Sequence, residues 1–217
     1  MKITIIGATG MAGKELTSEA LKRGHSVTAI GRSSEKLAKL VAGKDNQQLN
    51  TIAKDAFALT KADLADSDVI VDAFASSPDQ AYLHVDLATK LIAMFRGAKQ
   101  RLVFILGAGS LKTGEDHHLF VHDMEKNPKL QAIIEVPRNQ FAELTFLRTV
   151  KNVDWVGVSP AINFHPGAAT ELLLGKDELL FNDKGVSETS AGTMAVAILN
   201  EIEKPQHQKE RFTVADR

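Results

Sequence analysis

Residues 2–13 read Lys2-Ile-Thr-Ile-Ile-Gly7-Ala-Thr-Gly10-Met-Ala-Gly13, an apolar run that breaks into three glycines spaced three apart. The run predicts a buried parallel strand, and Gly7 permits a tight turn after it. Gly10 would let the backbone approach a pyrophosphate, and Gly13 would let the next helix pack close to the sheet. Free N–H groups at the start of that helix would face an anion. Because the glycines stand between a strand and the amphipathic segment Met11–Arg23, they indicate nucleotide binding rather than a chance turn.

The composition indicates one globular domain over residues 1–217, with a formal net charge of −1. This charge gives no reason to expect nucleic acid or an anionic membrane as a partner. The sequence has no cysteine, which excludes disulfides, thiolate nucleophiles and cysteine-ligated metals. No apolar run reaches the roughly 18 residues of a membrane span, and no signal-peptide pattern opens the chain. We therefore expect a cytoplasmic protein.

Strand and helix patterns alternate along nearly the whole chain. After the first strand, apolar runs predict strands at Ser26–Ile30, Leu49–Ala53, Asp68–Phe74, Arg101–Gly107 and Val153–Ser159. The alternation predicts an α/β fold, a Rossmann-type doubly wound parallel sheet of six principal strands with helices on both faces. Residues 160–180 are expected to leave the sheet as a small C-terminal lobe that covers the substrate. We expect a short strand at Glu178–Phe181 and a final edge strand at Phe212–Val214.

The second informative position is Arg32. An acid about 20 residues beyond the glycines usually holds the ribose 2′-OH in such sheets, but here the second strand ends in Gly31-Arg32-Ser33-Ser34. A guanidinium pairs with a 2′-phosphate, so Arg32, with Ser33 beside it, favours NADP over NAD. The alternative is a solvated arginine next to a helix N-cap.

Loops at other strand ends supply further candidates, because strand carboxyl ends line the ligand crevice of such sheets. Asp55 and Ala56 would contact the adenine, unless Asp55 only caps the next turn. The small residues of Ala73–Ser76 would let ribose and nicotinamide lie against backbone. Ser110, on a glycine-flanked loop, would sit where nicotinamide and substrate meet, the alternative being an ordinary polar turn residue.

The polar segment Thr113–Asn127 contains His117, His118 and His122. His118 and His122 are four residues apart and could share a metal on a helix. No neighbouring feature resembles a metal-enzyme motif, so solvated or substrate-facing histidines are expected and no metal site is predicted.

Four later motifs carry a family resemblance: Gly107-Ala-Gly109-Ser-Leu111, Trp155-Val-Gly-Val-Ser-Pro160-Ala, Gly175-Lys-Asp-Glu-Leu-Leu-Phe181 and Glu210-Arg-Phe-Thr-Val214. With the glycines of residues 7–13, the chain resembles the atypical short-chain dehydrogenase/reductases. More narrowly, it resembles the NADH-flavin reductase group, which is similar to biliverdin reductase B and to the NmrA-like proteins.

The resemblance implies a Rossmann fold that binds NAD(P), and Ser110 matches a serine that similar reductases place beside nicotinamide and substrate. The predicted cofactor contacts are Gly7, Thr9, Gly10, Met11, Gly13, Arg32, Ser33, Asp55, Ala56, Ala73, Phe74, Ala75, Gly107, Ala108, Gly109, Pro160 and Ala161. The catalytic Y-x-x-x-K pair of the wider superfamily is absent, because the only tyrosine is Tyr82 and Asp86 stands four residues on.

Without that pair, reduction of an isolated carbonyl ranks low. Two functions remain: an NADPH-preferring reductase that passes hydride to a small planar flavin or quinone, with solvent supplying the proton, and a non-catalytic NADP-binding regulator of the NmrA-like kind. The compact length leaves little material for a partner surface and favours the enzyme. Monomer and dimer both remain open.

Overall fold

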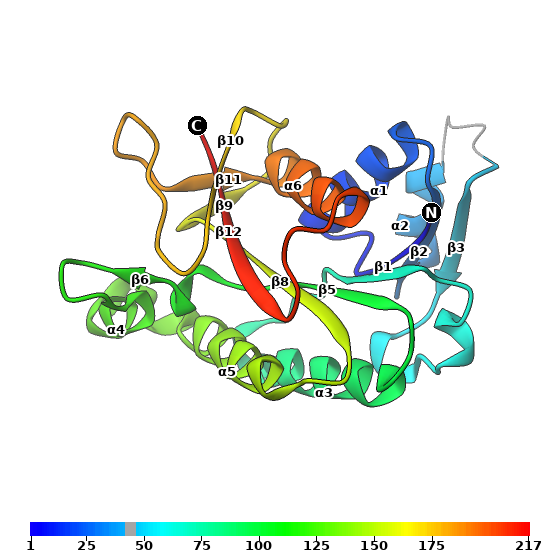
Figure 1. Ribbon diagram of the computed structural model, residues 1–217, viewed down its shortest axis with the longest axis horizontal. Coiled ribbons are helices and arrows are strands. Elements are labelled where there is room, and N and C mark those ends of the chain that lie inside the picture. The colour runs from blue at the N-terminus through cyan, green and yellow to red at the C-terminus, as the bar shows by residue number, and fades with distance from the viewer. Residues whose placement is uncertain (42–46) are drawn as a thin grey trace.

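The computed structural model describes residues 1–41 and 47–217, and its centre is one eight-stranded sheet between two layers of helices (Figure 1). The strand order is β10-β12-β8-β5-β4-β1-β2-β3. Every neighbouring pair is parallel except β10 with β12. The strands are β1 (Lys2–Ile6), β2 (Ser26–Gly31), β3 (Leu49–Ala53), β4 (Val69–Asp72), β5 (Arg101–Ile105), β8 (Asp154–Pro160), β10 (Leu172–Gly175) and β12 (Glu210–Asp216).

Two small sheets lie beside the central one. In the first, β6 (Lys112–Thr113) pairs antiparallel with β7 (His118–Leu119). In the second, β9 (Asn163–His165) pairs parallel with β11 (Glu188–Ser190). Both follow carboxyl ends of central strands, so they add material at the edge where the candidate site residues gather.

Helices cover both faces of the sheet, with α1 and α6 on one face and α3 and α5 on the other (Figure 1). Their bounds, with those of the shorter α2 and α4, are α1 (Met11–Lys22), α2 (Ser34–Val41), α3 (Leu83–Phe95), α4 (Phe120–Lys126), α5 (Glu135–Thr149) and α6 (Ala191–Glu203). Among the described helices, none combines the length and the apolar character needed to cross a membrane.

The alternation of side chains along the buried strands divides the core in two. Ile5 belongs to the cluster that also contains Leu16 of α1 and Ile198 of α6. Ile6, the next residue, belongs to the cluster that contains Leu91 of α3 and Leu144 of α5. Successive side chains of a strand point to opposite faces, so this division is what a sheet covered on both sides requires.

The predicted fold class is confirmed, and the six predicted parallel strands are all present in the central sheet. Two predictions at the carboxyl-terminal end are wrong. The segment Phe212–Val214 is not an edge strand, because it lies in β12 between β8 and β10. The edge strand is Leu172–Gly175, which gains a continuous antiparallel ladder with β12. In contrast, the predicted strand Glu178–Phe181 forms only an isolated bridge, between Glu178 and Lys112.

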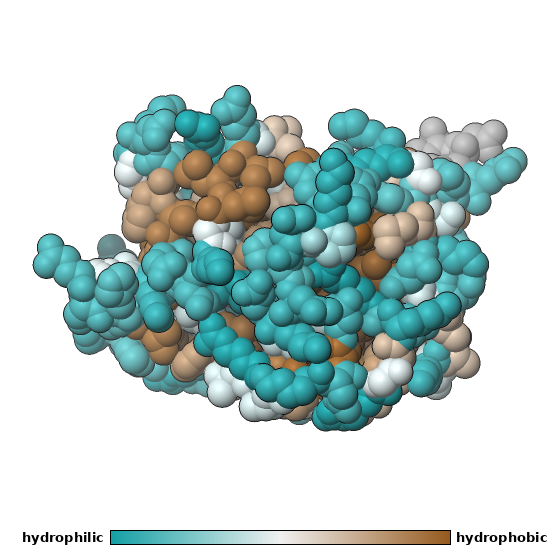
Figure 2. All heavy atoms as spheres, viewed as in Figure 1, coloured by the Kyte–Doolittle hydropathy of each residue, from teal (hydrophilic) through white to brown (hydrophobic). Residues whose placement is uncertain are grey.

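An apolar area covers the outer surface where β10 and α6 meet (Figure 2). A groove of about 420 Å³ lies there, and its apolar lining comes from Leu172, Leu174, Ala197 and Phe212. This groove is remote from the glycine turn after β1, so it is separate from the site described below.

Replacement of Gly13 by alanine tests the close packing of α1 on the turn. A Cβ at Gly13 would lie 2.2 Å from the carbonyl oxygen of Gly7 and 2.7 Å from the Cα of Ala8. An ordinary glycine-to-alanine change inside a helix stabilises it by about 1 kcal/mol. We expect Gly13→Ala instead to lower the free energy of unfolding by about 1 to 3 kcal/mol, measured by urea denaturation, because the backbone must shift. Ser18→Ala, at an exposed position of the same helix, is the control. A stabilised Gly13→Ala variant would contradict the packing argument.

Candidate functional site

Two connected cavities lie at the carboxyl ends of the central strands. The first cavity, of about 160 Å³, is lined by Ile6, Gly7, Thr9, Gly10, Ile30, Gly31, Arg32, Lys54, Asp55, Ala56, Ala73, Phe74 and Ala75. The second cavity, of about 400 Å³, lies towards β5 and β8. Gly10 and the segment 73–75 line both cavities. An elongated ligand can therefore extend from one cavity into the other.

The turn after β1 is held in the shape that an anion site needs. Gly7 has a φ of +79°, in the left-handed region, and a Cβ there would lie 2.5 Å from the carbonyl oxygen of Ala73. The amide of Gly10 donates to the carbonyl of Gly7 at 2.9 Å, and α1 begins at the next residue. Gly10, Met11 and Ala12 line the second cavity. The first N–H groups of a helix have no partner within the helix, so this end presents donors and positive potential to the cavities.

Arg32 stands at the rim of the first cavity with an exposed side chain. In the described part of the chain, its guanidinium has no hydrogen bond or ion pair. Lys54 also lines this cavity, but its ammonium is paired with Asp63 at 2.7 Å. A free guanidinium beside a paired ammonium makes Arg32 the cation that is ready to bind an anionic group here.

Ser33 and Asp55 both have local structural partners. The Ser33 hydroxyl accepts a hydrogen bond from the amide of Lys36 at 3.2 Å and does not line either cavity. The Asp55 carboxylate accepts from the amide of Phe57 at 2.8 Å, so it caps the following turn while also lining the first cavity. The capping role that the sequence left open for Asp55 is therefore present, and a ligand contact is compatible with it.

The second cavity has a polar backbone floor and an apolar wall. The loops at 73–76 and 107–109 form the floor. The wall comes from α4, the 3₁₀ segment Pro128–Ile133 and the start of α5, through Phe120, Met124, Leu130, Ile133, Val136 and Pro137. This wall was not among the features predicted from the sequence. Its signal was present in the spacing of Phe120 and Met124, four residues apart, and of Leu130, Ile133 and Val136, three apart.

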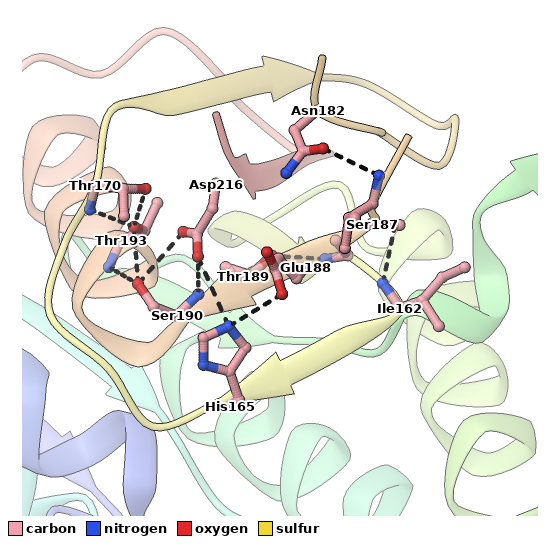
Figure 3. Close-up of polar contacts among 12 residues, drawn as sticks. Ile162, His165, Thr170, Asn182, Ser187, Glu188, Thr189, Ser190, Thr193 and Asp216 are labelled. Carbon is pink, nitrogen blue, oxygen red and sulfur yellow. Dashed lines mark hydrogen bonds and ion pairs between the residues drawn. The ribbon is translucent and has the colours of Figure 1, made fainter. Parts of the chain in front are cut away.

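The loop after β8 closes the second cavity and is tied by side-chain hydroxyls to the segment around β11 (Figure 3). The amide of Ala161 donates to the Thr189 hydroxyl at 2.8 Å, and the amide of Ile162 donates to the Ser187 hydroxyl at 3.2 Å. Thr189 in turn donates to the carbonyl of Val214 in β12. These bonds satisfy the amides of the two residues between β8 and β9, so the apolar cover of the cavity is fixed to the central sheet.

The last residue of β9, His165, faces two acidic residues. In Figure 3 the His165 ring points at two carboxylates, and its Nε2 lies 3.8 Å from both Glu188 and Asp216. The Ser190 hydroxyl accepts from the amide of Thr193 at 3.1 Å and caps α6. Ser190 therefore fixes the start of α6 beside His165, its partner in the ladder between β9 and β11.

Ser110 has a different place from the one expected. Its side chain is 4% exposed and does not line either cavity. The hydroxyl accepts a hydrogen bond from Arg211 Nη1 at 3.1 Å, and the same nitrogen donates to the Ser159 hydroxyl at 2.9 Å. The buried guanidinium of Arg211, far along the chain in β12, needs acceptors and turns Ser110 inward. In this arrangement Ser110 positions the 107–110 loop and makes no contact within the cavities.

Most of the other predicted residues do line the cavities. The first cavity contains Gly7, Thr9, Gly10, Arg32, Asp55, Ala56, Ala73, Phe74 and Ala75. The second adds Met11, Gly107, Ala108, Gly109, Pro160 and Ala161. Gly13 lies behind the turn and serves the packing of α1. The histidine pair His118 and His122 is divided between β7 and α4, and His118 bonds to Asp116 and Asp123 at 2.6 Å each.

Comparison with known proteins agrees with this geometry. The sequence model of a family described as NAD(P)H-binding matches residues 7–202. The chain belongs to this NAD(P)H-binding family. The resemblance to atypical short-chain dehydrogenase/reductases is thereby confirmed.

Individual relatives of this NAD(P)H-binding protein match over their whole length. YwnB of Bacillus subtilis (strain 168) is 40% identical over 217 residues, covering 99% of this chain and 98% of the relative. A protein structure from Lactobacillus casei is 37% identical, with a TM-score of 0.92 and coverage of 100% and 99%. SP1627 from Streptococcus pneumoniae TIGR4, described as "a putative NADH-flavin reductase", is 33% identical, with a TM-score of 0.86 and full coverage of both chains.

A buried acidic cluster stands behind the second cavity of the NAD(P)H-binding fold. It consists of Asp72 at the end of β4, His84 in α3 and Glu143 in α5, which are 7%, 5% and 2% exposed. Burial raises the pKa of Asp72 to about 7, against the effect of a hydrogen bond from the amide of Phe74. Burial, helped by the charge of Asp72, raises the pKa of Glu143 well above 4.5. Burial lowers the pKa of His84 to about 4. The raised pKa favours the protonated form of Glu143, and the lowered pKa keeps His84 uncharged at neutral pH.

The raised pKa of Glu143 predicts how stability depends on pH. An acid whose pKa is raised by folding binds more protons in the folded state, so the free energy of unfolding falls as pH rises above the unfolded value of 4.5. Glu143→Gln removes this group, and the decline between pH 4.5 and pH 7.5 should become shallower than in wild type. Urea denaturation at several pH values measures this decline in the free energy of unfolding. The control is Glu115→Gln, at an exposed position. Equal declines in wild type and Glu143→Gln would show that Glu143 does not gain a proton on folding.

Proposed function

We propose that the protein is an NADPH-dependent reductase that passes hydride from nicotinamide to a planar flavin or quinone acceptor. The observation that carries the proposal is the continuity of the two cavities through Gly10 and residues 73–75. One end offers a helix start and a free arginine, as a phosphorylated cofactor needs. The other end offers an apolar wall, which suits the face of a conjugated ring.

The residues present fit a dinucleotide along this path. Because Gly7 has no Cβ, the turn packs against the backbone of Ala73, and the start of α1 lies at the second cavity, where a pyrophosphate would approach it. Arg32 binds the 2′-phosphate of the adenosine half. The backbone of residues 73–76 and 107–109 supports the nicotinamide half. When bound, the nicotinamide supplies the hydride, and the apolar wall excludes water from the transfer.

The acceptor assignment is supported by the lining of the second cavity and by one relative. The wall from Phe120 to Pro137 offers flat apolar contact and no lysine or arginine among the described lining residues. The description of SP1627 as a flavin reductase belongs to that protein, and its full-length similarity makes flavin a reasonable first acceptor to test here.

Arg32→Ala should selectively weaken the binding of NADPH. Charge-assisted hydrogen bonds contribute about 1.5 to 3 kcal/mol, so their loss corresponds to roughly a tenfold to hundredfold weaker Kd. NADH lacks the 2′-phosphate, so its Kd should hardly change. Fluorescence titration of both cofactors measures this, with Lys36→Ala as a control for the loss of one positive charge nearby. If NADPH and NADH weaken equally in Arg32→Ala, Arg32 has a structural role and the NADP assignment fails.

Turnover tests the reaction itself. Purified protein should oxidise NADPH when FMN or 1,4-naphthoquinone is added under anaerobic conditions, and NADH should support a lower kcat/KM because Arg32 has no phosphate to bind. Absorbance at the NADPH band follows the reaction. Tight binding of NADPH without reduction of either acceptor, under conditions where a known reductase acts, would favour the cofactor-sensing regulator instead.

A further inference from the structure

Three buried polar atoms without a hydrogen-bond partner belong to residues that line the second cavity or lie directly behind one that does. They are Ser76 Oγ, His84 Nε2 and Glu143 Oε2 in the described part of the chain. Ser76 and His84 line the cavity, whereas Glu143 lies behind His84. Buried polar groups in folded proteins are almost always hydrogen-bonded, so unpaired ones beside a cavity indicate a group that arrives with a ligand.

The His84 ring connects a buried acid to the cavity. Its Nδ1 lies 3.9 Å from Glu143 Oε2, and Nε2, the nitrogen on the other side of the ring, has no partner. The ring of Phe74 packs edge-on against the imidazole, with centroids 5.5 Å apart, and Phe74 lines both cavities. The imidazole is therefore fixed between α5 and the place where the acceptor would meet the cofactor.

We propose that His84 is the proton donor to the reduced acceptor and that Glu143 is the positioning residue that supplies its proton. The proposal rests on the reductase function above and assigns the proton that hydride transfer requires. From the sequence alone, solvent was expected to supply this proton; in the proposal, a side chain of the protein supplies it.

The protons and electrons balance without another reactant. Hydride adds to the acceptor, which gains two electrons and becomes an anion, while NADPH becomes NADP⁺. The Nε2–H bond of His84 breaks, and its proton goes to the anionic oxygen or nitrogen of the acceptor. Nδ1 takes the proton of the Glu143 carboxyl, which becomes a carboxylate. After the product leaves, a proton that comes ultimately from solvent returns to Nε2, and Nδ1 returns its proton to Glu143.

The charge states of the cluster suit this exchange. A neutral imidazole carries one N–H and one acceptor nitrogen, so it can give a proton on one side while taking one on the other. The lowered pKa of His84 and the raised pKa of Glu143, both caused mainly by burial, favour an uncharged ring facing a protonated acid across 3.9 Å. The remaining titratable group of the cluster is Asp72, at the end of β4, whose charge favours the protonated form of Glu143.

Stopped-flow oxidation of NADPH by 1,4-naphthoquinone, in H₂O and in D₂O, tests the proposal. General acid catalysis contributes about 100-fold or more, so His84→Gln should lower kcat by about that factor while NADPH affinity stays close to wild type. Glu143→Gln should lower kcat less. Wild type should show a solvent deuterium isotope effect that both variants lose, which a merely structural role would not produce. His122→Gln, an exposed histidine of α4 outside both cavities, is the matched control.

A measurement on the unmodified protein complements the variants. The ¹⁵N resonance of His84 Nε2 should report a protonated nitrogen at pH 7 and should shift when 1,4-naphthoquinone is added to the NADP⁺ complex. Wild-type turnover with an unchanged His84→Gln rate and isotope effect, or an unmoved Nε2 resonance, overturns the role of His84 while the reductase function stands. Absence of any turnover in wild type removes the reductase function and this proposal with it.

Discussion

The contact between Gly13 and the carbonyl of Gly7 is the constraint on which the site depends. A Cβ at Gly13 would lie 2.2 Å from that carbonyl oxygen, so α1 can pack here only if residue 13 has no side chain. That packing brings the first N–H groups of α1 to the edge of the sheet. The same turn approaches Ala73 closely enough that Gly7 also tolerates no Cβ. As a result, the loops after β1 and β4 meet, and the two cavities form one path.

The loop at 107–110, which contributes to the floor of the second cavity, is held in place by one buried cation, Arg211. Arg211 is fully enclosed, pairs with Asp177, and donates to the hydroxyls of Ser110 and Ser159. Its bonds join β12, β8, the loop at 107–110 and the segment after β10. Leaving such a charge without acceptors costs far more than an ordinary polar contact gains, which makes this network obligatory once β12 lies inside the sheet. The inward direction of Ser110 is a consequence of it.

In contrast to the Arg211 network, the acidic cluster lowers the stability of the fold where it borders the second cavity. Asp72 and Glu143 are buried close enough that the charge of Asp72 raises the pKa of Glu143, and Glu143 Oε2 has no hydrogen bond to any residue that the structure describes. Apolar residues at these places would fill the same space without that cost. Destabilising arrangements of this kind are characteristic of functional sites, where the chemistry of the group outweighs its effect on stability.

The sequence by itself determined the parallel α/β fold and the glycine turn. It also determined that Arg32 and several small residues stand at the carboxyl ends of strands, since these features follow from spacing within short segments. It misplaced the edge strand, because Leu172–Gly175 becomes a strand only through its partner β12. The tertiary structure alone decided the direction of Ser110, the apolar wall of α4 and α5, and the meeting of His84 with Glu143. In each case the partners are distant in the chain, so burial and charge arise only when the helices pack on the sheet.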